Sequence, residues 1–205
     1  DEIPGLFLYP QLLLAVSVND ALYATTGTSK EYWVSWREQA VDGAGNAREV
    51  DLDPLVAPLI NGPLTAEERV RLYGWREHAS EVEAYFSETE SACDRLATAQ
   101  DRALYSLLRP ERLLALAYRF IVYDKGIKKI ARYQQFYAVQ QTAERVARLD
   151  HTSTRTGAQR TGGVIWHTTG SGKSLTMVWL AKALALHPAI QNPRVVIVTD
   201  RINLD

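Results

Sequence analysis

A short segment near the end of the chain combines glycines, a lysine and hydroxyl side chains. Residues 167–174 read His-Thr-Thr-Gly-Ser-Gly-Lys-Ser. A glycine-bearing loop that leads from a strand into a helix turns its backbone N–H groups into one concavity, where the helix N-terminus adds partial positive charge. In such a loop Lys173 reaches the β- and γ-phosphates of a nucleoside triphosphate, and the Ser174 hydroxyl ligates Mg²⁺. The segment therefore predicts a triphosphate site with catalytic Lys173 and metal-binding Ser174.

The loop departs from the usual pattern G-x-x-x-x-G-K-[ST] at its first position, where the chain has His167. Histidine must fit there without the positive φ that glycine permits. Gly170 and Gly172 still allow the backbone to approach a phosphate closely. The alternative is a chance match to a tight strand–helix turn. We expect His167 to be a packed or solvent-facing residue rather than a ligand or a catalyst.

The segments around the loop indicate the fold that positions it. Residues 164–166 have strand composition, and residues 173–186 form an apolar helix that is suited to packing on a sheet. Residues 194–200 are a β-branched run, which is typical of a parallel strand buried on both faces. Strand, loop, helix and strand in this order predict a right-handed βαβ unit and an α/β fold with a parallel sheet.

The rest of the chain changes character along its length. Residues 1–40 have mixed α/β character, and within them Leu6 to Val18 fits either a helix or a buried strand. Residues 41–66 have the glycines and prolines of a linker. Residues 65–100 are acidic and helix-prone, and begin with the capping-box pattern Thr-Ala-Glu-Glu. Residues 101–150 are basic and include a predicted amphipathic helix over 130–149.

Composition excludes several classes of protein. The chain has 205 residues, 46% of them apolar, a net charge of −1 and one cysteine, Cys93, so no internal disulfide framework is possible. No apolar run approaches the ~20 residues of a membrane span, and no cluster of histidine, cysteine and carboxylates has metal-ligand spacing. We expect a cytoplasmic protein. The chain begins with Asp1 and ends soon after a predicted strand, so we expect both ends to be cuts through a longer protein.

Two stretches together resemble a known family, the R (motor and nuclease) subunits of type I restriction enzymes. The first is the loop 167–174, and the second is Val195-Val-Ile-Val-Thr-Asp-Arg-Ile-Asn-Leu-Asp205. Residues 107–114 and 128–139 are similar to the segment that leads into the helicase core of this family. Residues 7–25 are similar to the end of its nuclease domain.

The resemblance implies a superfamily 2 DNA translocase and endonuclease that binds ATP and Mg²⁺. It implies that residues 1–40 end an α/β nuclease domain, that 41–106 are a linker and helical region, and that 107–205 begin a RecA-like ATPase domain. ATP hydrolysis would pull double-stranded DNA past the enzyme, and cleavage would follow. Separate modification and specificity subunits would be partners, and the specificity subunit would read the DNA target.

The resemblance also assigns roles to individual residues. The loop positions that it matches are Thr169, Gly170, Ser171, Gly172, Lys173 and Ser174. Gln135 matches the glutamine that reads adenine in such motors, with Arg132 beside it, because an amide can pair with both a donor and an acceptor of the base. Gln134 is the alternative reader, and Gln135 would otherwise be an exposed polar residue of a helix.

Thr199 and Arg201 match a second motor motif that contacts the DNA backbone. Arg201 could instead form a local ion pair with Asp200 or Asp205. The basic stretch 102–148 could line a DNA channel or simply form solvated helix faces. The remaining catalytic carboxylates of the family would lie outside the chain, so we expect the chain alone neither to hydrolyse ATP efficiently nor to cut DNA.

Two other interpretations stay open at this point. The loop could belong to another superfamily 2 helicase-like or AAA-type ATPase, which the sequence after residue 205 would distinguish. The chain could also be a truncated, non-enzymatic module that docks on a partner subunit, in which case it would fold without binding nucleotide.

Overall fold

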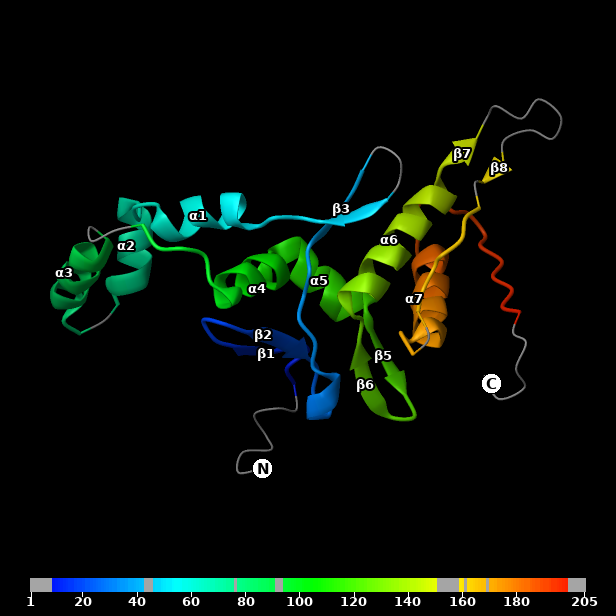
Figure 1. Cartoon of the computed structure of the whole chain (residues 1–205), viewed down its shortest axis with the longest axis horizontal. Helices are drawn as coiled ribbons and strands as arrows, with labels where there is room; N and C mark the ends of the chain where they lie inside the picture. The colour runs from blue at the N-terminus through cyan, green and yellow to red at the C-terminus, as the bar shows by residue number, and fades with distance from the viewer. Residues whose placement is uncertain are drawn as a thin grey trace.

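The computed structural model describes residues 9–42, 46–75, 77–90, 94–150, 159–160, 162–168 and 170–198, and shows a mixed α/β arrangement (Figure 1). The strands are β1 Leu13–Val16, β2 Ala21–Ala24, β3 Gln39–Val41, β4 Ala47–Glu49, β5 Ile121–Asp124, β6 Ile127–Ile130, β7 Leu149–Asp150 and β8 Gln159–Arg160. The helices are α1 Asp53–Asn61, α2 Ala66–Tyr73, α3 Ala79–Glu90, α4 Ala99–Leu108, α5 Pro110–Arg119, α6 Tyr133–Ala147 and α7 Lys173–Ala185, with a 3₁₀ turn at Lys30–Tyr32.

The strands pair with their neighbours in sequence as two-stranded antiparallel sheets. In the β5–β6 hairpin the two turn residues are Lys125 and Gly126, with φ values of 50° and 82°. Positive φ at both central residues matches the right-handed twist of the flanking strands. The apolar stretch 6–18, which periodicity left undecided, contains strand β1.

The parallel βαβ unit expected around the loop is not seen in the described part of the chain. Residues 164–168 and 194–198 form no strand, and their apolar side chains are largely exposed, with Val164 at 91% and Val198 at 86%. Hydrogen bonds to a neighbouring strand hold a β-strand in place, and neither run has such a neighbour among the described residues. The α/β class is confirmed, whereas the only sheets in these residues are antiparallel.

The helices follow the sequence pattern more closely. Helix α6 lies within the predicted range 130–149, and Pro110 is the first residue of α5, where its missing N–H costs nothing. The capping box at the start of α2 is present, with Thr65 and Glu68 exchanging hydrogen bonds. These local signals are strong because each is satisfied within a few residues of sequence.

The linker interpretation of residues 41–66 is wrong for two parts of that range, which form β4 and α1. Pro54 sits in the first turn of α1, where proline is tolerated. Arg102 of α4 donates two hydrogen bonds to the Asp53 carboxylate, at 2.6 and 2.9 Å. Tertiary contact with α4 therefore orders a helix whose own composition is unfavourable.

The hydrophobic core lies where the β1–β2 hairpin meets α4, α5, α6 and α7. Its buried members are Tyr23, Leu107, Leu116, Phe120, Ala131, Phe136, Tyr137, Val139 and Trp179. The Tyr23 hydroxyl donates to the Ala131 carbonyl at 2.9 Å, across 108 residues of sequence. Residues from the first 40 positions thus pack directly beside the elements that carry the loop.

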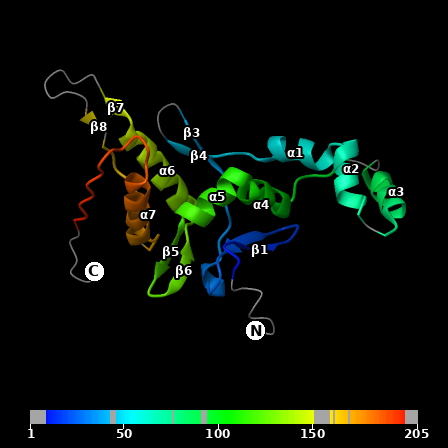
Figure 2. The ribbon, with the colours of Figure 1, turned by 180° about the vertical axis from the view of Figure 1, so that it is seen from behind.

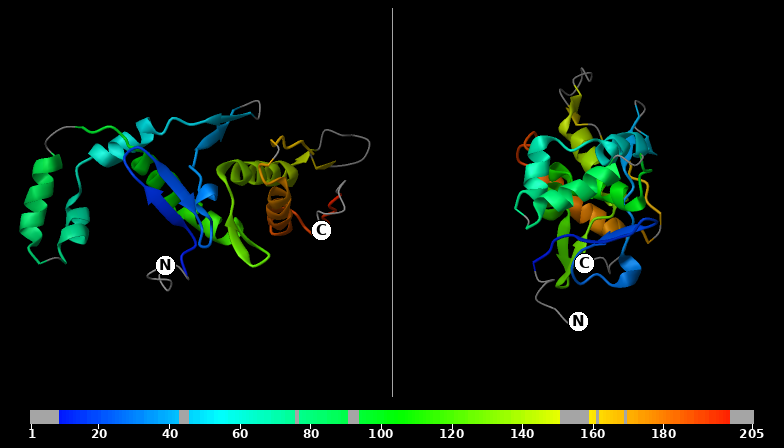
Figure 3. Two further views of the ribbon diagram at one scale, coloured as in Figure 1. Left: turned by 60° about the horizontal axis from the view of Figure 1, so that its bottom comes forward. Right: turned by 90° about the vertical axis from the view of Figure 1, so that its left-hand side faces the viewer.

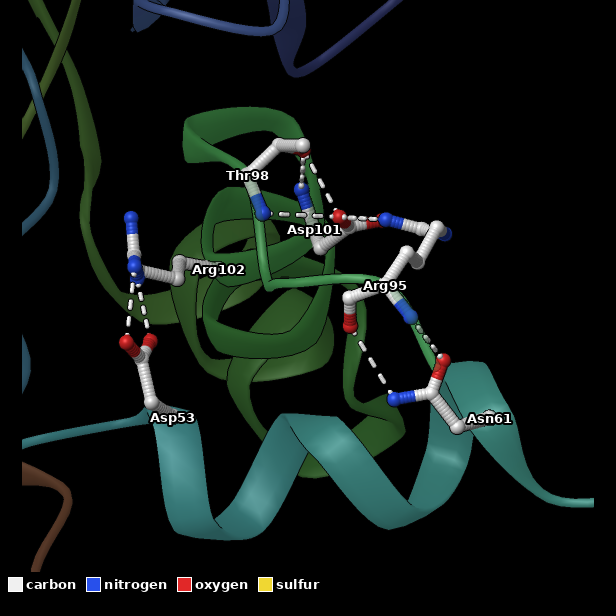
Figure 4. Close-up of polar contacts among 6 residues, drawn as sticks. All are labelled: Asp53, Asn61, Arg95, Thr98, Asp101 and Arg102. Carbon is white, nitrogen blue, oxygen red and sulfur yellow. Dashed lines mark hydrogen bonds and ion pairs between the residues drawn. The ribbon is translucent and has the colours of Figure 1, made fainter. Parts of the chain in front are cut away.

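Helices α2 and α3 form an arm that extends away from this core (Figures 1, 2 and 3). At its base the Asn61 side-chain amide pairs with the backbone N–H and C=O of Arg95, both at 3.0 Å (Figure 4). Arg95 in turn donates to both carboxylate oxygens of Asp101, at 2.6 and 2.9 Å. Asp101 also forms the capping box of α4 with Thr98. The two chain ends of the arm are therefore held together.

Candidate functional site

The predicted phosphate-binding loop leads directly into α7. Gly170 and Gly172 both have left-handed backbone conformations, with φ of 77° and 78°, and Gly172 is the N-cap of the helix. A side chain would be strained at either position. Among the described non-glycine residues, positive φ occurs only at His78, Lys125 and Asn192, so His167 fits without it, as expected.

Three hydrogen bonds within the loop converge on the Thr168 carbonyl. The Ser171 N–H and hydroxyl donate to it at 3.3 and 2.7 Å, and the Lys173 ammonium donates to it at 2.9 Å. Lys173 and Ser174 are both exposed at the first turn of α7. Thr169 lies outside the described residues. The loop therefore places a solvent-accessible cation and a hydroxyl beside a helix N-terminus, where an anion is stabilised.

Gln135 lies directly behind the loop, in the first turn of α6. Its side chain is only 3% exposed, and its Nε2 donates to the carbonyls of Ser171 and Gly172 at 3.2 and 3.1 Å. Its Oε1 accepts the backbone N–H of Arg132 at 2.9 Å. The structure brings Gln135 and the loop together across 36 residues of sequence, and the adenine-reading role stays a prediction. Gln134, the alternative reader, is exposed.

A cavity of about 410 Å³ opens beside the glycines of the loop. Its walls are the loop, Leu175 of α7, the β5–β6 hairpin and residues 23–34. Three of the side chains that line it are basic, namely Lys128, Lys129 and Arg132, and no carboxylate lines it. A cavity of this size and charge suits a small anionic ligand with an apolar part.

Sequence reasoning missed the contribution of residues 23–34, including Tyr32 and Ser29, to this cavity. No local motif marks them, because they reach the loop only through the long-range packing of the β1–β2 hairpin. The burial of Tyr23 and its hydrogen bond to Ala131 fix that packing. The mixed α/β character of residues 1–40 and the family resemblance of residues 7–25 gave no indication of this contact.

His167 lies within the electrostatic reach of Lys173. Partial burial, and then the positive charge of Lys173, lower the pKa of His167 below its ordinary value. The imidazole is therefore favoured in its neutral form beside the loop. A neutral histidine adds no repulsion to the cationic Lys173, so the departure from glycine at this position leaves the charge of the loop to the lysine.

An ion pair whose side chains are only 11% exposed joins α5 to Glu38, the residue before β3, beside the site. Arg112 donates to both oxygens of Glu38, at 3.1 and 2.8 Å, and its guanidinium lies 4.6 Å from the ring centre of Trp36. Arg109 and the Trp36 indole N–H also donate to this carboxylate. Burial would raise the pKa of Glu38, but hydrogen bonds and charges of the arginines outweigh it and the pKa lies below its ordinary value.

The other predicted features are settled only in part. Thr199 and Arg201 lie outside the described residues. No group of three or more histidine, cysteine or carboxylate side chains in the described segments could hold a metal ion. The metal-binding role of Ser174 stays a prediction. No helix in those segments is long and apolar enough to cross a membrane.

Part of the chain matches a known protein family. Residues 134–205, which include α6, the loop and α7, match the family described as SWI2/SNF2 ATPase. This match covers Gln135, the loop and α7, but not Arg132 or the other parts of the chain that line the cavity. No solved structure is significantly similar to the chain.

Curated relatives that match part of the chain are restriction enzyme subunits. The chain is 39% identical over 107 residues to the type I restriction enzyme HindI endonuclease subunit of Haemophilus influenzae, a match covering 50% of the chain. It is 36% identical over 108 residues, or 53% of the chain, to the putative MjaIXP endonuclease subunit of Methanocaldococcus jannaschii. The aligned parts are 10% of each relative. Over about half its length the chain is homologous to type I restriction enzyme endonuclease subunits, which confirms the resemblance seen in the sequence.

Proposed function

We propose that this chain is the ATP-binding portion of the restriction subunit of a type I restriction enzyme. The parent protein uses ATP hydrolysis to translocate double-stranded DNA and then cleaves it, in the cytoplasm and together with modification and specificity subunits. Residues 1–40 end its nuclease domain, and residues 41–106 are a linker and helical region. Residues 107–205 begin a RecA-like motor domain built on a parallel sheet. Similarity to the endonuclease subunits supports this proposal.

The observation that carries the proposal is the geometry of the loop. Two left-handed glycines lead into the N-terminus of a 13-residue helix, with Lys173 and Ser174 exposed at its first turn. A side-chain carbon added at Gly170 would meet nothing within 4 Å, so the loop is open at this point. Backbone amides, a helix dipole and a lysine in this arrangement favour a phosphate group.

The residues present fit ATP and Mg²⁺. The Lys173 ammonium bonds a neutral carbonyl, which is a weaker partner than the phosphates it would meet. The Ser174 hydroxyl has no hydrogen bond to any other described residue and is free to hold the cation. Mg²⁺ held there would offset the negative charge of the phosphates. Lys173, the cradle Thr169 to Gly172 and Arg132 hold the triphosphate, and the neighbouring cavity takes its nucleoside end.

The second motor motif contributes to the proposal by resemblance. We assign Thr199 and Arg201 as contacts to the DNA backbone of the parent protein. Such contacts position the protein on the duplex without reading its sequence. Replacing Arg201 should therefore weaken binding of unrelated DNA sequences to a similar extent.

Binding of Mg-ATP by the full chain tests the proposal, measured by calorimetry. Lys173→Ala should weaken binding roughly tenfold or more, because it removes a charge-assisted contact to phosphate. Lys182→Ala is the matched control: it removes the same charge from the same helix, but Lys182 bonds the Tyr118 carbonyl at the other end. If the wild-type chain is folded and binds no ATP at millimolar concentration, or if both variants weaken binding equally, the proposal is wrong.

A further inference from the structure

The Gln135 side chain uses all its donors on the loop. Its two N–H groups donate to the Ser171 and Gly172 carbonyls, and its oxygen accepts from the Arg132 N–H. The orientation of the amide is determined, because one end faces a donor and the other faces two acceptors. A side chain this deeply buried, with all three bonds made, is a fixed part of the loop's surroundings.

These bonds determine where the loop amides point. A trans peptide places its C=O and N–H on opposite sides. With the Ser171 carbonyl turned toward Gln135, the Gly172 N–H points away from it, toward the open side of the loop. The Gly172 carbonyl is also turned toward Gln135, so the Lys173 N–H likewise points away from Gln135. Both amides belong to the set that would bind phosphate.

The two carbonyls differ in how much they depend on Gln135. The Gly172 carbonyl also accepts the N–H and the hydroxyl of Thr176, at 3.1 and 3.2 Å, so the helix holds it. The Ser171 carbonyl has Gln135 as its single hydrogen-bond partner among the described residues. Since Gly172 has φ of 78° and no side chain, the Ser171–Gly172 peptide has little else to prevent it from turning over.

We propose that Gln135 is a positioning residue that locks the Ser171–Gly172 peptide with its N–H toward the phosphates. This rests on the proposed function, and it assigns Gln135 to the triphosphate rather than to the base. Reading adenine through both edges needs one donor and one acceptor from the amide. Gln135 could supply the donor only by releasing the loop.

Ligand discrimination separates the two roles. The full chain is titrated with Mg-ATP, Mg-GTP and inorganic tripolyphosphate. Gln135→Ala should weaken all three roughly tenfold, with the ATP-to-GTP ratio unchanged, because the disturbed amides contact only phosphate. Gln140→Ala, at an exposed position of the same helix, should change none of them. Loss of the preference for ATP over GTP, with tripolyphosphate binding unaffected, would overturn the proposal.

The glycines provide a second pair of variants. A side-chain carbon at Gly172 would lie 2.6 Å from the Gln135 Nε2, whereas one at Gly170 would meet nothing within 4 Å. The two positions share the same φ strain. Gly172→Ala should therefore reproduce the binding defect of Gln135→Ala, and Gly170→Ala should show a smaller one. Equal defects in both glycine variants would contradict a specific contact with Gln135.

N–H residual dipolar couplings of the ligand-free chain test the lock without any nucleotide. In Gln135→Ala the coupling of the Gly172 N–H, whose peptide Gln135 holds through the Ser171 carbonyl, should change, while that of the Thr176 N–H inside the helix stays the same. If wild-type chain binds none of the three ligands, the proposed function fails, and this measurement still decides on the lock. An unchanged coupling at Gly172, or changed couplings throughout α6 and α7, would show that Gln135 does not act on this peptide.

Discussion

Replacing Arg112 with leucine is expected to destabilise the chain strongly. The side chains of Arg112 and Glu38 are each only 11% exposed. Removing one partner of a buried ion pair costs about 3 to 5 kcal/mol, because the other charge remains buried. Glu38 retains its hydrogen bonds from Arg109 and Trp36, at 2.7 and 2.9 Å, so the expected loss of unfolding free energy is near the lower limit, about 3 kcal/mol.

The assay is urea unfolding of the full chain followed by circular dichroism, with a matched control. Arg37→Leu removes an arginine whose ion pair with Glu49 is exposed, with side-chain exposures of 59% and 61% and a distance of 3.5 Å. Exposed pairs contribute roughly 0 to 1 kcal/mol. Similar losses in the Arg112 and Arg37 variants would refute the reasoning, because Arg112 is nearly buried and makes two hydrogen bonds to Glu38, whereas Arg37 is exposed and makes one long contact.

Two predictions concern pH. The pKa of Glu38 is lowered in the folded state, so its ion pair stabilises the fold above the ordinary glutamate pKa. This stability is lost as pH falls through the lower pKa of the folded state. The stability of Glu38→Gln, measured by acid unfolding, should therefore depend less steeply on pH below about pH 4.5. The pKa of His167 is also lowered, so its contribution to stability should decrease as pH falls through about 6.5. An NMR titration should place the His167 pKa below that of the unfolded chain. In Lys173→Ala the His167 pKa should rise but stay below its ordinary value, because burial still lowers it. If the His167 pKa does not rise in this variant, Lys173 is not a cause of the shift.

The parts of the site that sequence could predict are those built from neighbouring residues. The order of glycines, Lys173 and Ser174 predicts the loop, and apolar spacing predicts α6 and α7, because capping and periodicity act within a few turns. The resemblance to restriction subunits identified Gln135, which lies 36 residues before Ser171 of the loop, as a candidate site residue. It predicted a contact with adenine, whereas the described contacts are with the loop's own carbonyls.

Long-range features were beyond the reach of the sequence. Glu38 lies between segments that read as strand and linker, and nothing near it indicates that Arg112, 74 residues later, will share its buried position. Residues 23–34 form a wall of the cavity, and this contact likewise depends on packing between segments far apart in the sequence. For the runs at 164–166 and 194–198, strand composition alone does not produce a strand in the described chain, because pairing requires a neighbour at hydrogen-bonding distance.

The pairing of Asn61 with the main chain of Arg95 has a topological consequence. It closes the path of the chain before and after α2 and α3, much as a short turn would. The length and content of what lies between can therefore vary without changing how α1 joins α4 or how the loop 167–174 is supported. A site of this kind is where a protein accepts an insertion, a deletion or a grafted module most readily, and it offers a place for a label or an affinity tag remote from that loop.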